Sequence, residues 1–177
     1  MRNNVAVDKN SREYQENLFK GGRSNLLLVL IFTVVNLVMV LMGSDSYWLF
    51  SAIIPYYLTL FGIVWDGAVI GTLTITALVI SAVILGAYLA CWILSKKRTG
   101  WLVAALVLFV LDTLAMLGLM LLLGFGIMDM LFDVIFHAWV IFSLVRGCLA
   151  AKKLKEMPET VENPVPFQSE GPEVDEM

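Results

Sequence analysis

The sequence contains little charge, since Asp, Glu, Lys and Arg make up only 15% of its 177 residues. Soluble domains usually carry about 25%. Apolar residues make up 59%, which leaves too little polar surface to cover a soluble fold. This composition excludes a disordered chain and a coiled coil. We therefore expect an integral membrane protein that contacts the lipid bilayer.

Cysteine and catalytic motifs are also scarce. Cys91 and Cys148 stand alone, without CxxC or CxH neighbours, which argues against a disulfide framework, a redox pair and a structural zinc site. The sequence has no Walker phosphate loop, no HExxH and no GxSxG. We expect no cofactor and favour a protein without enzyme activity. A hydrolase that uses Ser81 or Ser143 with His137 is a distant alternative.

The few basic residues are grouped. All 12 lie within residues 2–23, 96–98 and 146–155, and each group borders a long apolar run. Because cytoplasmic segments carry the excess of Lys and Arg, we expect all three groups and both termini in the cytoplasm. A nucleic-acid partner is not expected, since it would need basic residues interleaved with aromatic ones on a folded face. The acidic segment 156–177 is predicted to be a disordered cytoplasmic tail.

Four long apolar runs predict the membrane-spanning helices. A helix rises 1.5 Å per residue, so about 20 residues cross the ~30 Å hydrocarbon core. We expect a bundle over residues 25–150, with spans at about 25–43, 68–95, 101–123 and 127–149. Residues 1–24 are predicted to form a cytoplasmic segment with a short interfacial helix that ends at Gly21-Gly22.

A fifth uncharged run, rich in aromatic residues, lies between the first two spans. If it crossed the membrane, residues 96–98 would lie on the side opposite to the N-terminal basic group, against the positive-inside rule. Pro55 would also break a spanning helix. We therefore predict an all-α, polytopic bundle of four spanning helices, with residues 46–66 as an exterior interfacial or re-entrant segment. This segment is the expected lid or partner surface.

Asp112 is the most informative residue inside a span. It lies eleven residues beyond Trp101, which places it about 16 Å along a helix and near the middle of the membrane. A carboxylate there costs at least about 2.5–3.5 kcal/mol and must be paired, hydrated or protonated. Asp112 and His137 lie 13 and 12 residues on either side of Phe125. An antiparallel hairpin that turns near Phe125 would bring both to the same depth.

A polar stripe leads toward this depth, because Asp129, Asp133 and His137 recur every four residues. One interpretation is a proton or cation path entered from outside, with His137 as the titrating group. The other is a buried pair of Asp112 with His137 that fixes helix register, with Asp129 and Asp133 hydrated at the interface. A metal ion held by His137, Asp133 and Asp112 is a minor alternative, and we assign no metal site.

Other polar and small residues predict helix packing. Thr33 and Asn36 in the first span are expected to make interhelical hydrogen bonds. Ala82, Gly86 and Ala90 have the small-xxx-small spacing of tight helix contacts, either within the bundle or between protomers.

These observations favour a non-enzymatic membrane scaffold or accessory subunit. It would act as a homo-oligomer or with a membrane-protein partner, and the short loops favour a bacterial plasma membrane. The alternative is a small proton- or cation-coupled transporter that uses Asp112, His137 and Asp133.

Overall fold

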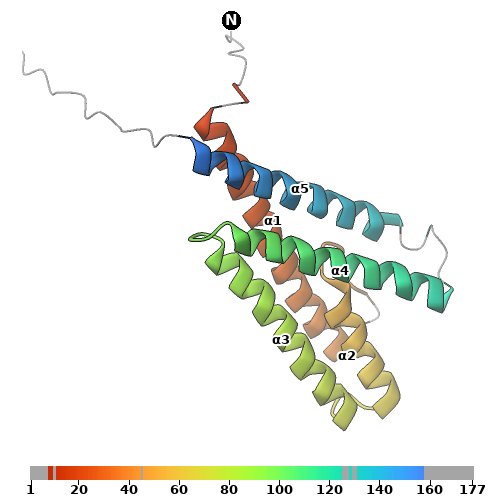
Figure 1. Ribbon diagram of the computed structural model, residues 1–177. Helices are drawn as coiled ribbons and strands as arrows, with labels where there is room; N and C mark the ends of the chain where they lie inside the picture. The colour runs from red at the N-terminus through yellow and green to blue at the C-terminus, as the bar shows by residue number, and fades with distance from the viewer. Residues whose placement is uncertain (1–7, 10, 45, 125–127, 129–130, 158–177) are drawn as a thin grey trace, which may run out of the picture.

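The computed structural model describes residues 8–9, 11–44, 46–124, 128 and 131–157. These residues form five helices: α1 (Arg12–Leu41), α2 (Ile53–Asp66), α3 (Thr72–Leu94), α4 (Gly100–Leu123) and α5 (Leu131–Glu156) (Figure 1). Four of them are long and apolar enough to cross a membrane, and α2, with 14 residues, is shorter. The prediction of an all-α bundle with four spans and one shorter segment is confirmed. The protein is a polytopic integral membrane protein.

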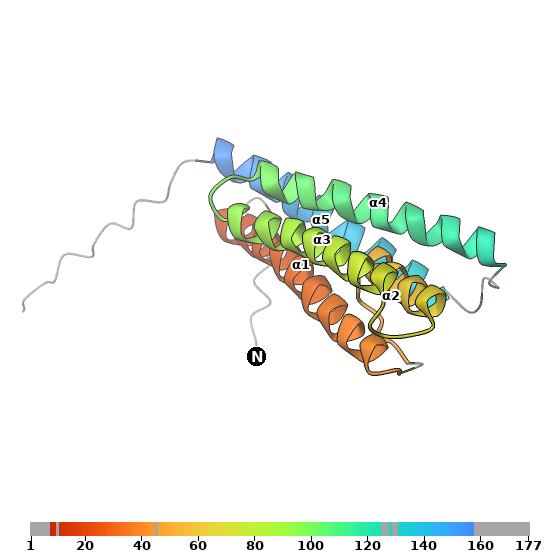
Figure 2. The ribbon, with the colours of Figure 1, turned by 90° about the horizontal axis from the view of Figure 1, so that it is seen from below.

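The two ends of the bundle differ in charge. The start of α1, the turn from α3 to α4 and the end of α5 lie at the same end, as Figure 2 shows. The three basic groups belong to these places, so their described members gather at this end. We call it the basic end. The predicted acidic tail lies almost entirely outside the described residues, which stop at Met157.

The N-terminal half of α1 differs from the prediction. We expected a short helix that stops at Gly21-Gly22, but α1 is one continuous helix of 30 residues. The Ser11 hydroxyl caps its start by accepting the Tyr14 N–H at 3.2 Å. Gly22 is used for packing, because a Cβ there would lie only 3.2 Å from the Gly147 Cα of α5. This close crossing stabilises the helix beyond the weak tendency of a glycine pair to end it.

Polar contacts tie α1 to α3 and α5 near the basic end. Arg23 donates through Nε to the Ser95 hydroxyl and through Nη2 to the Trp92 carbonyl, both at 3.0 Å. A cation at these last carbonyls of α3 also meets the negative end of the helix dipole. Asn25 donates to the Ser143 hydroxyl of α5. These bonds hold α1 in place beside both helices.

The apolar core lies mainly where α1, α4 and α5 meet. Its fully buried members include Leu26, Val29, Leu102, Ala105, Phe109, Val140 and Leu144. On α4 the buried positions continue from this core to Asp112. The core therefore presents one carboxylate to the middle of the bundle.

The predicted packing stripe of α3, which consists of Ala82, Gly86 and Ala90, faces mostly outward. Ala82 and Gly86 are exposed, and a Cβ at Gly86 would meet no atom within 4 Å. The inner face of α3 is formed by other residues, among them Ser81 and Tyr88. Ala82 and Gly86 therefore do not pack inside the bundle, and Ala90 is half-buried.

We predict that Gly22→Leu destabilises the protein by about 1–3 kcal/mol, because its side chain would push α5 away at Gly147 and at the Ser143 carbonyl. Gly21→Leu is the matched control, since a Cβ at Gly21 would meet nothing within 4 Å. Thermal unfolding in detergent measures both variants. Equal melting temperatures for the two would contradict the close crossing of α1 and α5.

Candidate functional site

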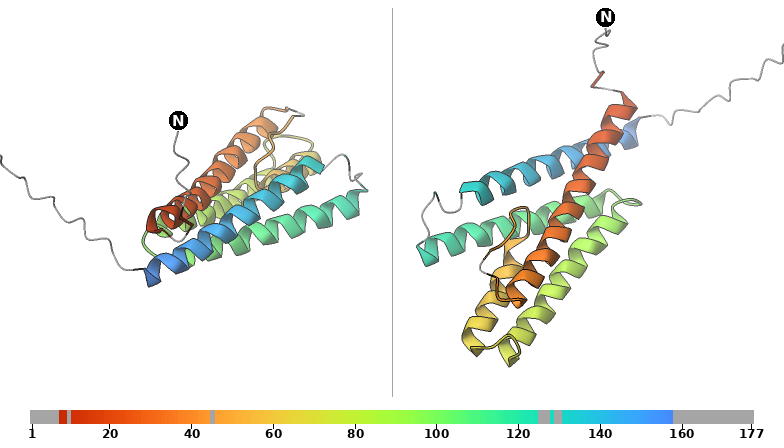
Figure 3. Two further views of the ribbon diagram at one scale, coloured as in Figure 1. Left: turned by 90° about the horizontal axis from the view of Figure 1, so that it is seen from above. Right: turned by 180° about the vertical axis from the view of Figure 1, so that it is seen from behind.

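The chain between α1 and α3 enters the bundle and returns to the end from which it came (Figure 3). An extended stretch runs back along α1, and α2 then leads outward again. The start of α2 contacts Asp112, which stands near the middle of α4. We call residues 46–66 the re-entrant segment, because this path matches one of the two forms expected for it.

Thr33, Asn36, Asp112 and Asp133 bond this segment from the spanning helices. Together with the partner of Asp133 and the neighbour of Asp112 they form what we call the polar cluster: Thr33, Asn36, Tyr47, Asp112, Asp133 and His137. They come from α1, α4, α5 and the re-entrant segment itself. Five of them are buried, and Tyr47 is half-buried.

Asn36 holds the extended stretch beside α1. Its Oδ1 accepts the Trp48 N–H at 2.7 Å, and its Nδ2 donates to the Trp48 carbonyl and the Ser51 hydroxyl, both at 2.7 Å. A single amide side chain thus pairs with the backbone as a neighbouring strand would. We predicted interhelical bonds for Asn36, but its partners belong to the re-entrant segment.

Asp112 accepts the first two amides of α2. The N–H groups of Ile53 and Ile54 donate to Oδ2 and Oδ1 of Asp112, both at 2.9 Å. A helix that starts away from water needs protein acceptors for its first N–H groups. The carboxylate also meets the positive end of the dipole of α2. Asp112 therefore caps a helix from a different part of the chain.

The remaining amides at the start of α2 are also accounted for. The Ala52 N–H donates to the Thr33 hydroxyl at 2.8 Å, and this hydroxyl donates to the Val29 carbonyl of its own helix. Thr33 thus bonds the re-entrant segment and makes no bond to another spanning helix. Pro55 occupies the third helical position, where its missing N–H leaves nothing unsatisfied. Pro55 argued against a spanning helix in this segment, but it is compatible with the buried first turn of a short helix.

His137 lies beside Asp112 in the middle of the bundle. His137 Nδ1 lies 2.8 Å from the Asp133 carbonyl oxygen, which can only accept, so Nδ1 carries a hydrogen. His137 Nε2 lies 3.4 Å from Asp112 Oδ2. Both side chains are buried, and the imidazole stacks on Phe109 with ring centres 4.9 Å apart.

Asp133 is buried rather than hydrated. The Tyr47 hydroxyl donates to its carboxylate from the re-entrant segment, and only 3% of Asp133 is exposed. Burial and this hydrogen bond raise the pKa of the Tyr47 phenol above its ordinary value of 10.0. The phenol therefore stays protonated, as a donor to Asp133, at neutral pH. The expectation that Asp133 is hydrated at an interface is wrong, and Asp129 lies outside the described residues.

The described part of the chain offers no metal centre, because it contains no group of three His, Cys, Asp or Glu side chains close enough to bind one ion. Asp133 turns its main-chain carbonyl to His137 and its carboxylate to Tyr47. Every buried side-chain nitrogen and oxygen among the described residues has a hydrogen-bond partner. The polar cluster is a satisfied network.

Sequence reasoning selected Asp112, His137, Asp133, Asn36 and Thr33, but not Tyr47 or the amides at the start of α2. Those amides are backbone groups, so no residue type marks them. The one available signal was Pro55, which is favoured in the first turn of a helix.

No protein-family model, curated protein or solved structure matches this chain.

We predict that Thr33→Val lowers the unfolding free energy by about 1–3 kcal/mol, because it leaves the Ala52 N–H buried without an acceptor. Thr113→Val is the matched control, since Thr113 donates in the same way to the carbonyl four residues earlier and, within the described residues, accepts no hydrogen bond from α2. Denaturation in detergent compares the two variants. An equal loss of stability in both would show that the amide of Ala52 does not depend on Thr33.

Proposed function

We propose that this protein is a non-enzymatic scaffold or accessory subunit of a membrane complex, located in a bacterial plasma membrane with both termini in the cytoplasm. The observation that carries this proposal is that the buried ionisable groups are occupied in holding the re-entrant segment. Both oxygens of Asp112 accept backbone amides, and Oδ2 also lies 3.4 Å from His137 Nε2.

A transported ion or proton would need access to this carboxylate. Only 1% of Asp112 and 1% of His137 are exposed. Surface grooves lie at the basic end, between α2 and α3, and beside Phe50. Neither Asp112 nor His137 lines any of these grooves. Displacing either oxygen of Asp112 would leave an amide of α2 unsatisfied, which costs about 1–3 kcal/mol. This arrangement favours a structural role for the pair.

Charge supports the proposed orientation. The described basic residues gather at one end of the bundle (Figure 2), and cytoplasmic segments carry the excess of Lys and Arg. The outward face of α3 supports contact with another spanning helix. Small residues there allow two backbones to approach closely, as helices do when they associate in membranes.

We predict that chemical cross-linking in native membranes yields an adduct larger than the monomer and that Gly86→Leu reduces its yield, because leucine would hold a neighbouring helix away from α3. Gly118→Leu on α4 is the matched control, since a Cβ there also meets nothing within 4 Å. A chain that remains entirely monomeric after cross-linking would contradict the proposal.

The second candidate function is proton- or cation-coupled transport. The specific observation in its favour is a series of contacts from Tyr47 through Asp133 and His137 to Asp112. A short helix that starts within a bundle is also a feature of ion sites in transporters. Transport would require these contacts to break and re-form during each cycle.

Flux in proteoliposomes separates the two functions. The scaffold proposal predicts that the wild-type protein conducts no more protons or monovalent cations than protein-free liposomes between pH 5 and 8. A pH-dependent flux that Asp133→Asn abolishes would establish the transporter instead. Asp133 is the better position for this test, because its carboxylate accepts from the Tyr47 hydroxyl, whereas Asp112→Asn would disturb the start of α2 itself.

A further inference from the structure

We propose that the groove between the start of α1 and the end of α5 binds the phosphate of an anionic phospholipid, with one acyl chain lying along the α1–α5 contact. The groove has a volume of about 510 Å³ and lies at the basic end. This inference is independent of the proposed scaffold function.

The groove is lined by cations that have no carboxylate partner within the described residues. Lys9, Arg146, Lys152 and Lys153 line it together with one acidic residue, Glu156. The ion pairs found in the described part of the chain involve other basic residues, namely Arg12, Lys20 and His137. A phosphate would supply the missing negative charge.

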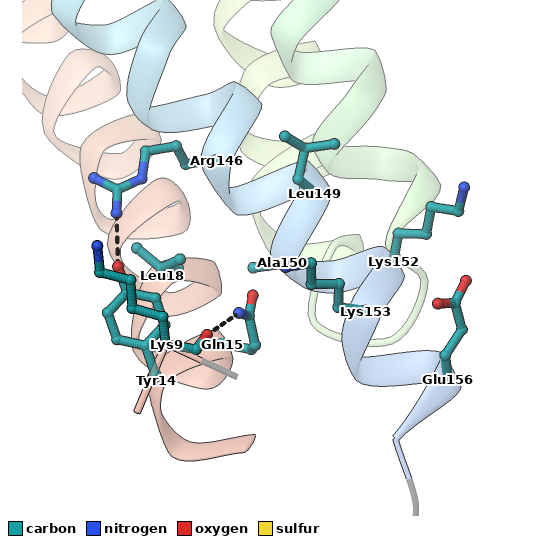
Figure 4. A pocket seen from close by; sticks show the side chains of 10 residues that line it. All are labelled: Lys9, Tyr14, Gln15, Leu18, Arg146, Leu149, Ala150, Lys152, Lys153 and Glu156. Atoms are coloured by element: carbon teal, nitrogen blue, oxygen red, sulfur yellow. Dashed lines mark hydrogen bonds between the residues drawn. The ribbon is translucent and has the colours of Figure 1, made fainter. Parts of the chain in front are cut away.

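Arg146 is held in place for this role. Its Nη2 donates to the Tyr14 hydroxyl at 3.1 Å, and its guanidinium lies 5.4 Å from the ring centre of Phe142. Figure 4 shows the side chain reaching from α5 toward Tyr14 on α1, with Leu18 beside them. The Tyr14 oxygen accepts from Arg146, so its own hydrogen can be donated to an anion. Arg146 keeps further N–H donors, whose planar fork suits phosphate oxygens.

The surroundings favour a lipid over a free anion. Leu18, Leu149 and Ala150 form an apolar part of the groove wall. A second hollow of about 170 Å³ shares Leu18 and Arg146 with the groove. It continues along the two helices toward Trp139. Its wall includes the apolar side chains of Leu18, Trp139 and Phe142, so a phosphate at Arg146 would have room with apolar contacts for an acyl chain directly beside it.

Gly21 lines this second hollow. A Cβ at Gly21 would meet nothing within 4 Å, so a larger side chain there would enter the hollow without disturbing the helices. A substitution at Gly21 therefore tests the acyl-chain part of the proposed site independently of the phosphate part, because Gly21 lies on the acyl-chain path and carries no charge.

Native mass spectrometry of the full-length protein in detergent tests the proposal. Phosphatidylglycerol, phosphatidylcholine and inorganic phosphate are titrated separately. We expect wild-type protein to retain phosphatidylglycerol more tightly than phosphatidylcholine. Lys9→Gln combined with Arg146→Gln should weaken phosphatidylglycerol binding by about 30-fold, since each cation near anionic lipid contributes about 1 kcal/mol. The control pair Lys96→Gln and Lys97→Gln, which are exposed at the same end, should leave it near the wild-type value.

Two further variants identify the source of the phosphate. Gly21→Leu should weaken phosphatidylglycerol binding, and Gly118→Leu should not. If inorganic phosphate binds as tightly as phosphatidylglycerol and Gly21→Leu changes neither, the groove is a site for a free anion and the lipid proposal fails. If the Lys9/Arg146 pair and the Lys96/Lys97 control pair weaken phosphatidylglycerol binding equally, the effect is one of general surface charge. This result would also overturn the proposal.

Discussion

The structure depends on the contact between Asp112 and the start of α2. A helix that begins inside a bundle must have its first amides satisfied by protein groups, because water is not present to accept them. Asp112 accepts two of these amides, Thr33 accepts a third, and Pro55 has none to offer. Without these acceptors the re-entrant segment would have no stable position within the bundle.

His137 lies beside the carboxylate that caps α2. A lone carboxylate near the middle of the bundle would be costly, and the two N–H donors of α2 together with the neighbouring imidazole reduce that cost. His137 is in turn oriented by the carbonyl of Asp133, whose side chain accepts from Tyr47. The network therefore links α4 and α5 to both the start of the re-entrant segment and the start of α2. Removing one member leaves its direct partner without that hydrogen bond.

Much of the fold could be predicted from the sequence, because hydrophobic length and the positions of basic residues reflect strong physical constraints. The pairing of Asp112 with His137 also follows from equal depth in an antiparallel hairpin. The capping of α2 could not be predicted, since the acceptor lies 58 residues or more from its amides and backbone groups carry no sequence signal. The role of Gly22 was predicted wrongly for a related reason. Only the position of Gly147 shows that Gly22 allows α1 and α5 to cross closely and does not end a helix.

The most direct test compares the melting temperatures of the wild type and Asp112→Asn in detergent. The account predicts that Asp112→Asn melts clearly lower, because an asparagine side chain offers one oxygen for the two N–H groups of Ile53 and Ile54. Asp66→Asn is the matched control, since a single oxygen of Asp66 accepts the Thr74 N–H at 2.8 Å and an asparagine oxygen can keep this bond. Its loss of stability should be smaller. An Asp112→Asn protein that melts at or above the wild-type temperature would contradict the account.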